Sequence, residues 1–201
     1  MQRLGTLFVV SAPSGAGKTT LCNSLRQRDD FTYSISCTTR PPRPGEADGE
    51  DYFFLSRGAF EEKIRAGDFL EHATVHGNFY GTLKKTVFDS LDQGKDILLD
   101  IDIQGAAAIR TLSDARLKSC LADIFIMPPT FAELERRLRK RQTESEEQIR
   151  LRLENARQEM RHWSEYKYTI LSGSIEEDLD KFRAIMKAER YHSSRLILGE
   201  I

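Results

Sequence analysis

The sequence has few cysteines and no long apolar run. Its three cysteines, Cys22, Cys37 and Cys120, form no C-x-x-C pair. An odd, scattered set of this kind is typical of reduced thiols in a cytoplasmic protein. No apolar run approaches the roughly 18 residues that a membrane span needs, and the N-terminus has no signal-peptide pattern. We therefore expect a cytoplasmic protein that has no membrane partner.

The sequence also lacks an excess of charge of either sign. Thirty Lys and Arg residues stand against 31 Asp and Glu residues, which gives a formal net charge of −1. A protein that binds nucleic acid nonspecifically is usually basic, so we expect no nucleic-acid partner. A chain of 201 residues is long enough for one domain with a sizeable core and an insertion or two.

Short apolar runs alternate with helical patterns along most of the chain. This rhythm predicts an α/β fold, a parallel sheet flanked by helices. The expected strands cover residues 6–10, 33–40, 97–101, 121–127 and 166–171. The expected helices begin near residues 17, 105, 130, 143 and 175. Thr130 is the expected N-cap of the third of these helices, with Glu133 at the capping-box position.

A segment of mixed character interrupts this rhythm between residues 35 and 90. It contains a short strand at 51–56, a helix that Ser56 caps and Gly67 ends, and an alternating strand at 69–75 followed by a Gly-rich turn. We interpret 35–90 as a small α+β insertion and 1–34 with 91–201 as the core.

The stretch "APSGAGKTTL", residues 12–21, follows the first expected strand and opens a helix. Gly15 and Gly17 let the backbone turn so that its N–H groups point inward, where a phosphate accepts them. Lys18 would reach the β- and γ-phosphates of a nucleotide, and the Thr19 hydroxyl would ligate Mg²⁺. The predicted nucleotide-binding loop comprises Ala12, Pro13, Ser14, Gly15, Ala16, Gly17, Lys18, Thr19 and Thr20. It departs from the pattern G-x-x-x-x-G-K-[ST] at Ala12, and the alternative is a plain Gly/Ser connection.

Two clusters inside the insertion suit a small anion and a base edge. Ser36, Arg40, Arg43 and Tyr52 would place two guanidinium forks and two hydroxyls around a phosphate monoester. Glu71, facing Thr82 and Tyr80, would accept from N1–H and N2–H₂ of guanine, a pair of donors that adenine lacks. The alternative for the first cluster is that Arg40 and Arg43 are solvated loop residues. The alternative for the second is that Glu71 is a surface residue of a strand.

The core carries two further clusters of charge. Asp100 and Asp102 end a buried strand, where an acidic residue orients Mg²⁺ or its waters or holds a second substrate; an N-cap is the alternative. Arg137, Arg141 and Arg152 flank a polar link, as a lid that closes on phosphates needs, although a solvated helix is equally compatible. His72 and His76 lack a third ligand, so we expect no metal site there.

Taken together, these motifs resemble the guanylate kinase family over essentially the whole chain. The succession S-A-P-S-G-A-G-K-T, S-x-T-T-R-x-P-R-x-G-E, G-x-x-Y-x-F, F-L-E, G-N-x-Y-G-T and D-I-D-x-Q-G is highly specific. The resemblance implies a P-loop nucleoside monophosphate kinase with a GMP-binding insertion and a helical lid at about 138–150, which moves the γ-phosphoryl group of ATP to GMP in guanine nucleotide metabolism.

The same resemblance implies roles for the residues that match the motifs. Ser36, Arg40, Arg43, Tyr52 and Tyr80 would surround the GMP phosphate, and Glu71, Thr82, Ser36 and Asp102 would read or support guanine. Lys18, Arg137, Arg141 and Arg152 would be catalytic, and Thr19 and Asp100, the latter through water, would hold Mg²⁺. The chain has Leu171, Ser172 and Gly173 where the family often has V-N-D, which puts the adenine contact in doubt.

Three alternatives belong to other classes. A scaffold module of this fold would lose the Gly-Lys-Thr that this chain keeps, a kinase for another acceptor would lack Glu71 with Thr82, and a GTPase would need an N-K-x-D motif, which is absent. The sequence leaves the oligomeric state open, with a homo-oligomer among the options.

Overall fold

The computed structural model describes residues 2–27, 31–75, 77–140 and 145–197. Five strands form a parallel sheet in the order β10-β9-β2-β8-β3, which confirms the predicted α/β class. Their bounds are β2 (Leu7–Ser11), β3 (Thr32–Tyr33), β8 (Ile97–Asp100), β9 (Leu121–Met127) and β10 (Tyr168–Leu171). Because the strands are parallel, their carboxyl ends meet at one edge, where open α/β sheets bind ligands.

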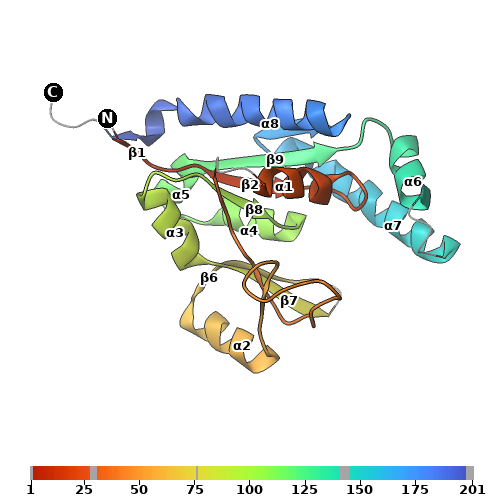
Figure 1. Ribbon diagram of the computed structural model, residues 1–201, viewed down its shortest axis with the longest axis horizontal. Coiled ribbons are helices and arrows are strands. Elements are labelled where there is room, and N and C mark those ends of the chain that lie inside the picture. Colours follow the sequence, from red (N-terminus) through yellow and green to blue (C-terminus); the bar gives the residue numbers. More distant parts are fainter. Residues whose placement is uncertain (1, 28–30, 76, 141–144, 198–201) are drawn as a thin grey trace.

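The alternation of side chains along β2 explains how helices come to cover both faces of this sheet. Leu7 and Val9 point into a core shared with α3 (Lys84–Asp92), α4 (Ile103–Thr111) and α5 (Ala115–Cys120). Phe8 and Val10 point the other way, into a core shared with α1 (Lys18–Arg26) and α8 (Ile175–Arg190). Figure 1 shows α8 on one side of the sheet and α3, α4 and α5 on the other. All five residues of β2 are fully buried, as a strand covered on both faces requires.

A second, mixed sheet has the order β5-β4-β7-β6 and lies apart from the first (Figure 1). Its strands are β4 (Cys37–Thr38), β5 (Phe53–Phe54), β6 (Phe69–Val75) and β7 (Asn78–Leu83). Helix α2 (Arg57–Ala66) packs Phe60 on it, against Phe69 and Cys37. As predicted, the Ser56 hydroxyl caps α2 by accepting from the Ala59 N–H, and Gly67 ends it in the left-handed conformation. The boundaries 35–90 remain a proposal.

The prediction of a single strand over residues 33–40 is wrong. The structure divides it between the two sheets: β3 pairs with β8, and β4 pairs with β5 and β7. The Ser34 N–H still donates to the Leu98 carbonyl of the first sheet, at 2.9 Å. Two residues later the Ser36 carbonyl accepts from Phe53 N of the second sheet, also at 2.9 Å. The apolar pattern is the same on both sides of Ser36, because it reports burial and not which sheet supplies the partner strand.

The basic segment forms two helices, α6 (Phe131–Lys140) and α7 (Glu146–Glu159). A short 3₁₀ turn, η1 (Met160–Glu165), follows α7. Leu134, Leu138 and Ala156 join them in a small apolar cluster. Among the described residues, no helix is both long and apolar enough to cross a membrane. The three cysteines are free and buried.

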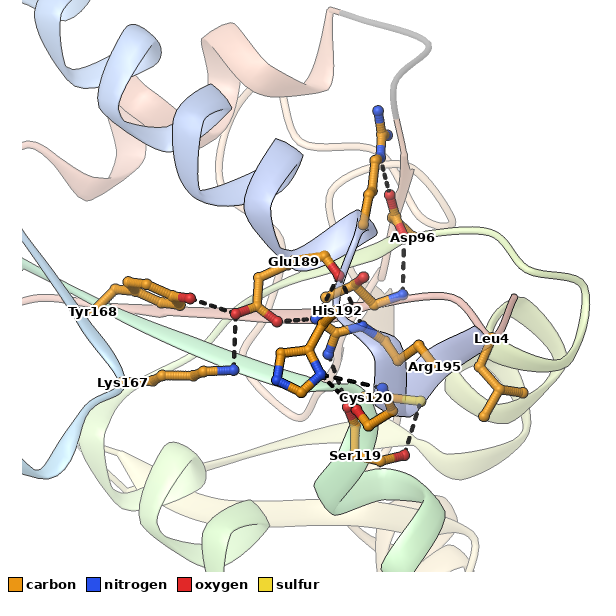
Figure 2. A network of polar contacts seen from close by, with 12 residues as sticks. Leu4, Asp96, Ser119, Cys120, Lys167, Tyr168, Glu189, His192 and Arg195 are labelled. Carbon is orange, nitrogen blue, oxygen red and sulfur yellow. Dashed lines mark hydrogen bonds and ion pairs between the residues drawn. The ribbon is translucent and has the colours of Figure 1, made fainter. Parts of the chain in front are cut away.

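The amino edge of the first sheet carries a polar network that ties the C-terminal segment to the rest of the chain (Figure 2). Arg195, in the 3₁₀ turn η2 (Ser193–Arg195), pairs with the Glu189 carboxylate and donates to the Ser119 carbonyl at 2.8 Å. Glu189 also accepts from Lys167 Nζ at 2.8 Å and from Tyr168. The segment continues into β11 (Leu196–Ile197), which pairs with β1 (Gln2–Arg3).

Candidate functional site

The loop between β2 and α1 has the conformation that its glycines predict. Gly15 and Gly17 both have left-handed backbone angles, with φ of 89° and 105°. Residues other than glycine rarely adopt such angles. Gly17 is the N-cap of α1, so Lys18 and Thr19 occupy the first turn of the helix. The loop and this turn together line one hollow, where the backbone N–H groups of a helix N-terminus favour an anion.

Lys18 lies between the loop and the end of β8. Its ammonium group forms an ion pair with Asp100 and donates to the Ile101 carbonyl at 3.2 Å. Burial by itself would lower the pKa of Lys18, but the Asp100 carboxylate outweighs it, so the pKa lies above its usual value. Lys18 is therefore charged and held at the carboxyl edge of the sheet.

Asp102 follows β8 by two residues and caps α4. Its Oδ1 accepts from Gly105 N at 2.8 Å, so the alternative interpretation of this residue as an N-cap is confirmed. It nevertheless lines the same pocket as Asp100 and Lys18. The capping contact fixes the carboxylate at the pocket wall without removing it from the pocket.

Glu71 is a buried carboxylate of the second sheet. A register shift between Phe69 and Glu71 interrupts the pairing of β6 with β7, and Phe69, Leu70 and Glu71 are all buried. Glu71 pairs in register with Thr82, whose Oγ1 donates to Glu71 Oε1 at 2.6 Å. Burial raises the pKa of Glu71 to about 7, an effect that the Thr82 hydrogen bond opposes and the nearby Asp102 adds to. The predicted facing pair is confirmed, and the surface alternative is wrong.

The two predicted arginines of the insertion differ in their surroundings. Arg40 Nη2 donates to Glu46 Oε1 at 2.8 Å, and its guanidinium lies 5.4 Å from the Tyr52 ring centroid. Tyr52 in turn contacts Tyr80 edge to face, at 6.0 Å between ring centroids. Arg43 is exposed, and its backbone N–H donates to the other oxygen of Glu46. Sequence reasoning missed Glu46, although a carboxylate next to two arginines was the available signal.

One pocket of about 270 Å³ lies between the two sheets and draws its walls from both. The first sheet and its loop contribute Lys18, Thr19, Asp100 and Asp102, and the second sheet and its approaches contribute Ser36, Tyr52, Glu71 and Tyr80. Thr82 lies buried behind Glu71. Arg40 and Arg43 are not among the residues that line this pocket. The predicted nucleotide-binding loop and the buried carboxylate thus face the same space.

Two of the three arginines predicted to act with a lid contact the loop directly. Arg137 Nη1 donates to the Ala16 carbonyl at 3.2 Å and to the Ser172 hydroxyl at 3.1 Å, and Arg137 Nε donates to Glu133. Arg152 Nη1 lies 3.3 Å from Ser14 Oγ. Arg141 and His76 lie outside the described residues. Within the described residues, no cluster of three or more His, Cys, Asp and Glu is placed to hold a metal ion.

The capping of α6 differs from expectation, and the contacts of Ser172 and Gly173 were not predicted. The Thr130 hydroxyl accepts from Glu133 N at 3.1 Å as an N-cap does, but the Glu133 carboxylate binds Arg136 and Arg137 instead of completing a capping box. Ser172, at the position where the sequence departs from V-N-D, is buried and holds Arg137. Gly173 N donates to Asp178 of α8 at 2.9 Å.

Comparison with known proteins identifies the family of this chain. The family model described as guanylate kinase matches residues 4–189. Guanylate kinase of Clostridium tetani is 42% identical over 192 residues, which are 96% of this chain and 90% of that protein. Guanylate kinase of Syntrophotalea carbinolica is 47% identical over 199 residues, 98% of this chain and 91% of that protein. The crystal structure of guanylate kinase from Anaplasma phagocytophilum superimposes with a TM-score of 0.79 at 34% identity, covering 97% of this chain and 91% of that one. The chain therefore belongs to the guanylate kinase family.

Proposed function

We propose that this chain converts GMP to GDP with ATP, as a nucleoside monophosphate kinase, through the residues that meet in the pocket between its two sheets. The observation that carries the proposal is the composition of that pocket. Lys18 of the phosphate loop and the buried carboxylate of Glu71 line the same space, from opposite sheets. This arrangement supports a triphosphate site at the loop and a base site at Glu71 that open onto one pocket.

The ATP phosphates would lie on the loop of residues 12–20. The helix N-terminus and Lys18 favour the negative charge of the β- and γ-phosphates. An oxygen of the GMP 5′-phosphate attacks the γ-phosphorus, the bond from that phosphorus to the β-γ bridging oxygen breaks, and ADP leaves. No side-chain nucleophile is needed, so the protein contributes alignment and charge stabilisation.

Magnesium fits the residues at this position. The described residues offer no all-protein metal cluster, and Mg²⁺ usually binds through one or two carboxylates together with substrate phosphates. The Thr19 hydroxyl and the Asp100 carboxylate, the latter through water, would hold it beside the loop. When bound, Mg²⁺ supplies neutralisation of the charge on the β- and γ-phosphate oxygens.

The second sheet would hold GMP. The ionised Glu71 carboxylate would accept from N1–H and N2–H₂ of guanine, with Asp102, Thr82 and Ser36 supporting it. Tyr52, Tyr80, Arg40 and Arg43 would surround the 5′-phosphate, with Arg40 exchanging its Glu46 partner for the phosphate. Such a base site rejects adenine because the carboxylate would be left buried and unpaired.

Residues 1–34 and 91–201 would act as the core, 35–90 as the GMP-binding insertion and about 138–150 as the lid. Arg137, Arg141 and Arg152 would clamp the transferring phosphoryl group when the lid closes. Closure excludes water, which would otherwise hydrolyse ATP.

A coupled assay of ADP release with GMP, AMP, UMP and CMP as acceptors tests this proposal. We expect turnover with GMP to exceed turnover with each of the others by on the order of 10²-fold or more, the range for a site that hydrogen-bonds its substrate. The Lys18→Ala variant serves as the blank for contaminating kinases. Comparable turnover with AMP or a pyrimidine nucleotide would contradict the assignment of Glu71 as the base reader.

A further inference from the structure

Gly105 occupies a helical position that would favour another residue on local grounds. It is the third residue of α4, and its backbone does not adopt a left-handed conformation. Alanine is the better helix former at such a position, so neither the helix nor the backbone angle calls for glycine. The reason must lie in what surrounds the α-carbon.

A side chain at Gly105 would meet the Glu71 carboxylate. A β-carbon built on Gly105 lies 2.7 Å from Glu71 Oε2 and 3.2 Å from Glu71 Cδ, and the next nearest atom is Asp102 Oδ1 at 3.3 Å. The severe clash is therefore with Glu71, and Asp102 would be a second, milder close contact. A carbon and an oxygen that are not bonded cannot approach to 2.7 Å, so either the new methyl group or the Glu71 carboxylate would have to move.

The Glu71 carboxylate has little freedom to move away. Its other oxygen is bound by Thr82 at 2.6 Å, and the residue is only 6% exposed. Asp102, which borders the same space, is fixed by its bond to Gly105 N. The carboxylate therefore sits between a hydroxyl of its own sheet and the bare α-carbon of a helix that belongs to the other sheet.

We propose that Gly105 is a specificity-determining position, at which the absence of a side chain allows the Glu71 carboxylate to lie where it reads the acceptor base. This inference rests on the proposed function for its substrate. Gly105 acts through Glu71 and is a positioning residue. Base selection would then depend on the contact between α4 of the core and β6 of the second sheet.

The Gly105→Ala variant tests the proposal by adding one methyl group. We expect the KM for GMP to rise about tenfold or more, the effect of misplacing one charged hydrogen-bonding partner, while the KM for ATP stays within about twofold. The Gly58→Ala variant is the matched control. Gly58 also lies in the first turn of a helix, but nothing is within 4 Å of its β-carbon position, so both KM values should be unchanged.

A double-mutant cycle with Glu71→Asp identifies the cause. The shorter aspartate withdraws its carboxylate from α4, so the methyl group of Gly105→Ala no longer clashes with residue 71, and only the milder contact with Asp102 is left. We expect Gly105→Ala to lower the melting temperature of the nucleotide-free wild-type chain by about 3–6 °C and to leave that of the Glu71→Asp chain unchanged or higher. This readout does not depend on any substrate.

The outcomes separate the two proposals. If the wild-type chain does not prefer GMP, the proposed function fails, while the melting cycle still decides whether Gly105 positions Glu71. If the wild-type chain prefers GMP but Gly105→Ala changes both KM values equally, or neither, the inference about Gly105 is overturned. Should Gly105→Ala fail to fold, the double variant decides: a folded double variant supports the proposal, and an unfolded one overturns it.

Discussion

Thr82 Oγ1 donates a hydrogen bond to Glu71 Oε1 across the β6–β7 pair, at 2.6 Å. The bond occupies one oxygen of the Glu71 carboxylate. The residue is buried and lines the wall of the pocket. It orients the carboxylate and leaves acceptor capacity for a ligand, since each carboxylate oxygen can accept two hydrogen bonds.

Glu71→Gln keeps the shape of this side chain but replaces one acceptor with a donor. If the carboxylate accepts from two donors of guanine, we expect kcat/KM for GMP to fall by on the order of 10²-fold, as for the loss of roughly 3 kcal/mol of pairing. The value for AMP should not fall, because the amide can donate to N1 of adenine. Steady-state assays with both acceptors measure this. A parallel loss for GMP and AMP would show that Glu71 is structural.

The raised pKa of Glu71 predicts a pH dependence of GMP binding. Burial raises this pKa to about 7, so the carboxyl group is protonated below that pH and loses acceptor capacity. We expect the KM for GMP to rise as the pH falls through about 7, and the KM for ATP to respond less. The phosphate of GMP titrates near pH 6 as well. The Glu71→Gln variant keeps that titration and lacks the carboxyl one, so the difference between the two profiles isolates Glu71. Superimposable profiles would contradict the assignment.

The same pKa has a consequence for stability. A carboxyl group whose pKa is raised on folding favours the folded state below its unfolded pKa, and this contribution is lost as the pH rises through the folded pKa. The wild-type chain should therefore lose stability relative to Glu71→Gln between about pH 5 and about pH 8. Thermal unfolding at both pH values measures this, and an unchanged difference between the two chains would mean that Glu71 does not titrate in this range.

The features that the sequence predicts well are local ones. The phosphate loop, the Ser56 cap and the Gly67 end of α2 each depend on neighbouring residues, and all have the expected conformation. Helix α3 was not predicted, and its N-terminus has no capping side chain to mark it. Short strands such as β1 and β11 are two residues long and leave no periodic signal.

The features that the sequence does not reveal depend on contacts between distant residues. Arg137 meets Ser172, 35 positions away, and the division of residues 33–40 depends on which strands lie on either side of Ser36. The need for glycine at position 105 arises from a carboxylate on another sheet. Such contacts are set by the tertiary fold, and neither propensity nor spacing contains them.

Lys18→Ala should abolish most phosphoryl transfer without unfolding the chain. It removes the charge that the structure holds beside the loop by its contacts with Asp100 and Ile101. We expect kcat to fall by at least about 10²-fold, as for the loss of one preorganised charge stabiliser. Circular dichroism checks the fold. A well-folded variant with nearly normal turnover would contradict the role of the loop.

Arg40→Ala and Arg43→Ala should each raise the KM for GMP more than the KM for ATP. Losing a charged hydrogen-bond partner is worth about 1.5–3 kcal/mol, and the two nucleotides are assigned to separate sides of the pocket. Arg40 must first leave Glu46, so Glu46→Gln should lower the KM for GMP or leave it unchanged. An equal effect of the arginine variants on both substrates would indicate a role in closure instead.

The network of Figure 2 predicts a variant that affects stability and leaves catalysis intact. Arg195 and Glu189 are each 1% exposed at the side chain, and Arg195 joins the C-terminal segment to the Ser119 carbonyl. Their partners precede the strands of the first sheet, whereas Lys18 and Asp100 lie at the opposite, carboxyl edge. Arg195→Met keeps much of the volume but leaves the buried carboxylate with Lys167 and Tyr168 only.

We expect Arg195→Met to lower the free energy of unfolding by about 3 kcal/mol, the lower end of the range for breaking a buried ion pair. Arg183→Ala is the control, because its pair with Asp180 is on the surface of α8, the helix that carries Glu189, where such pairs are worth at most about 1 kcal/mol. Urea titrations measure both variants, and kcat per folded molecule should be unchanged in each. Equal destabilisation by the two variants would mean that the Arg195–Glu189 pair contributes no more than a surface contact, and that the C-terminal segment is held by packing instead.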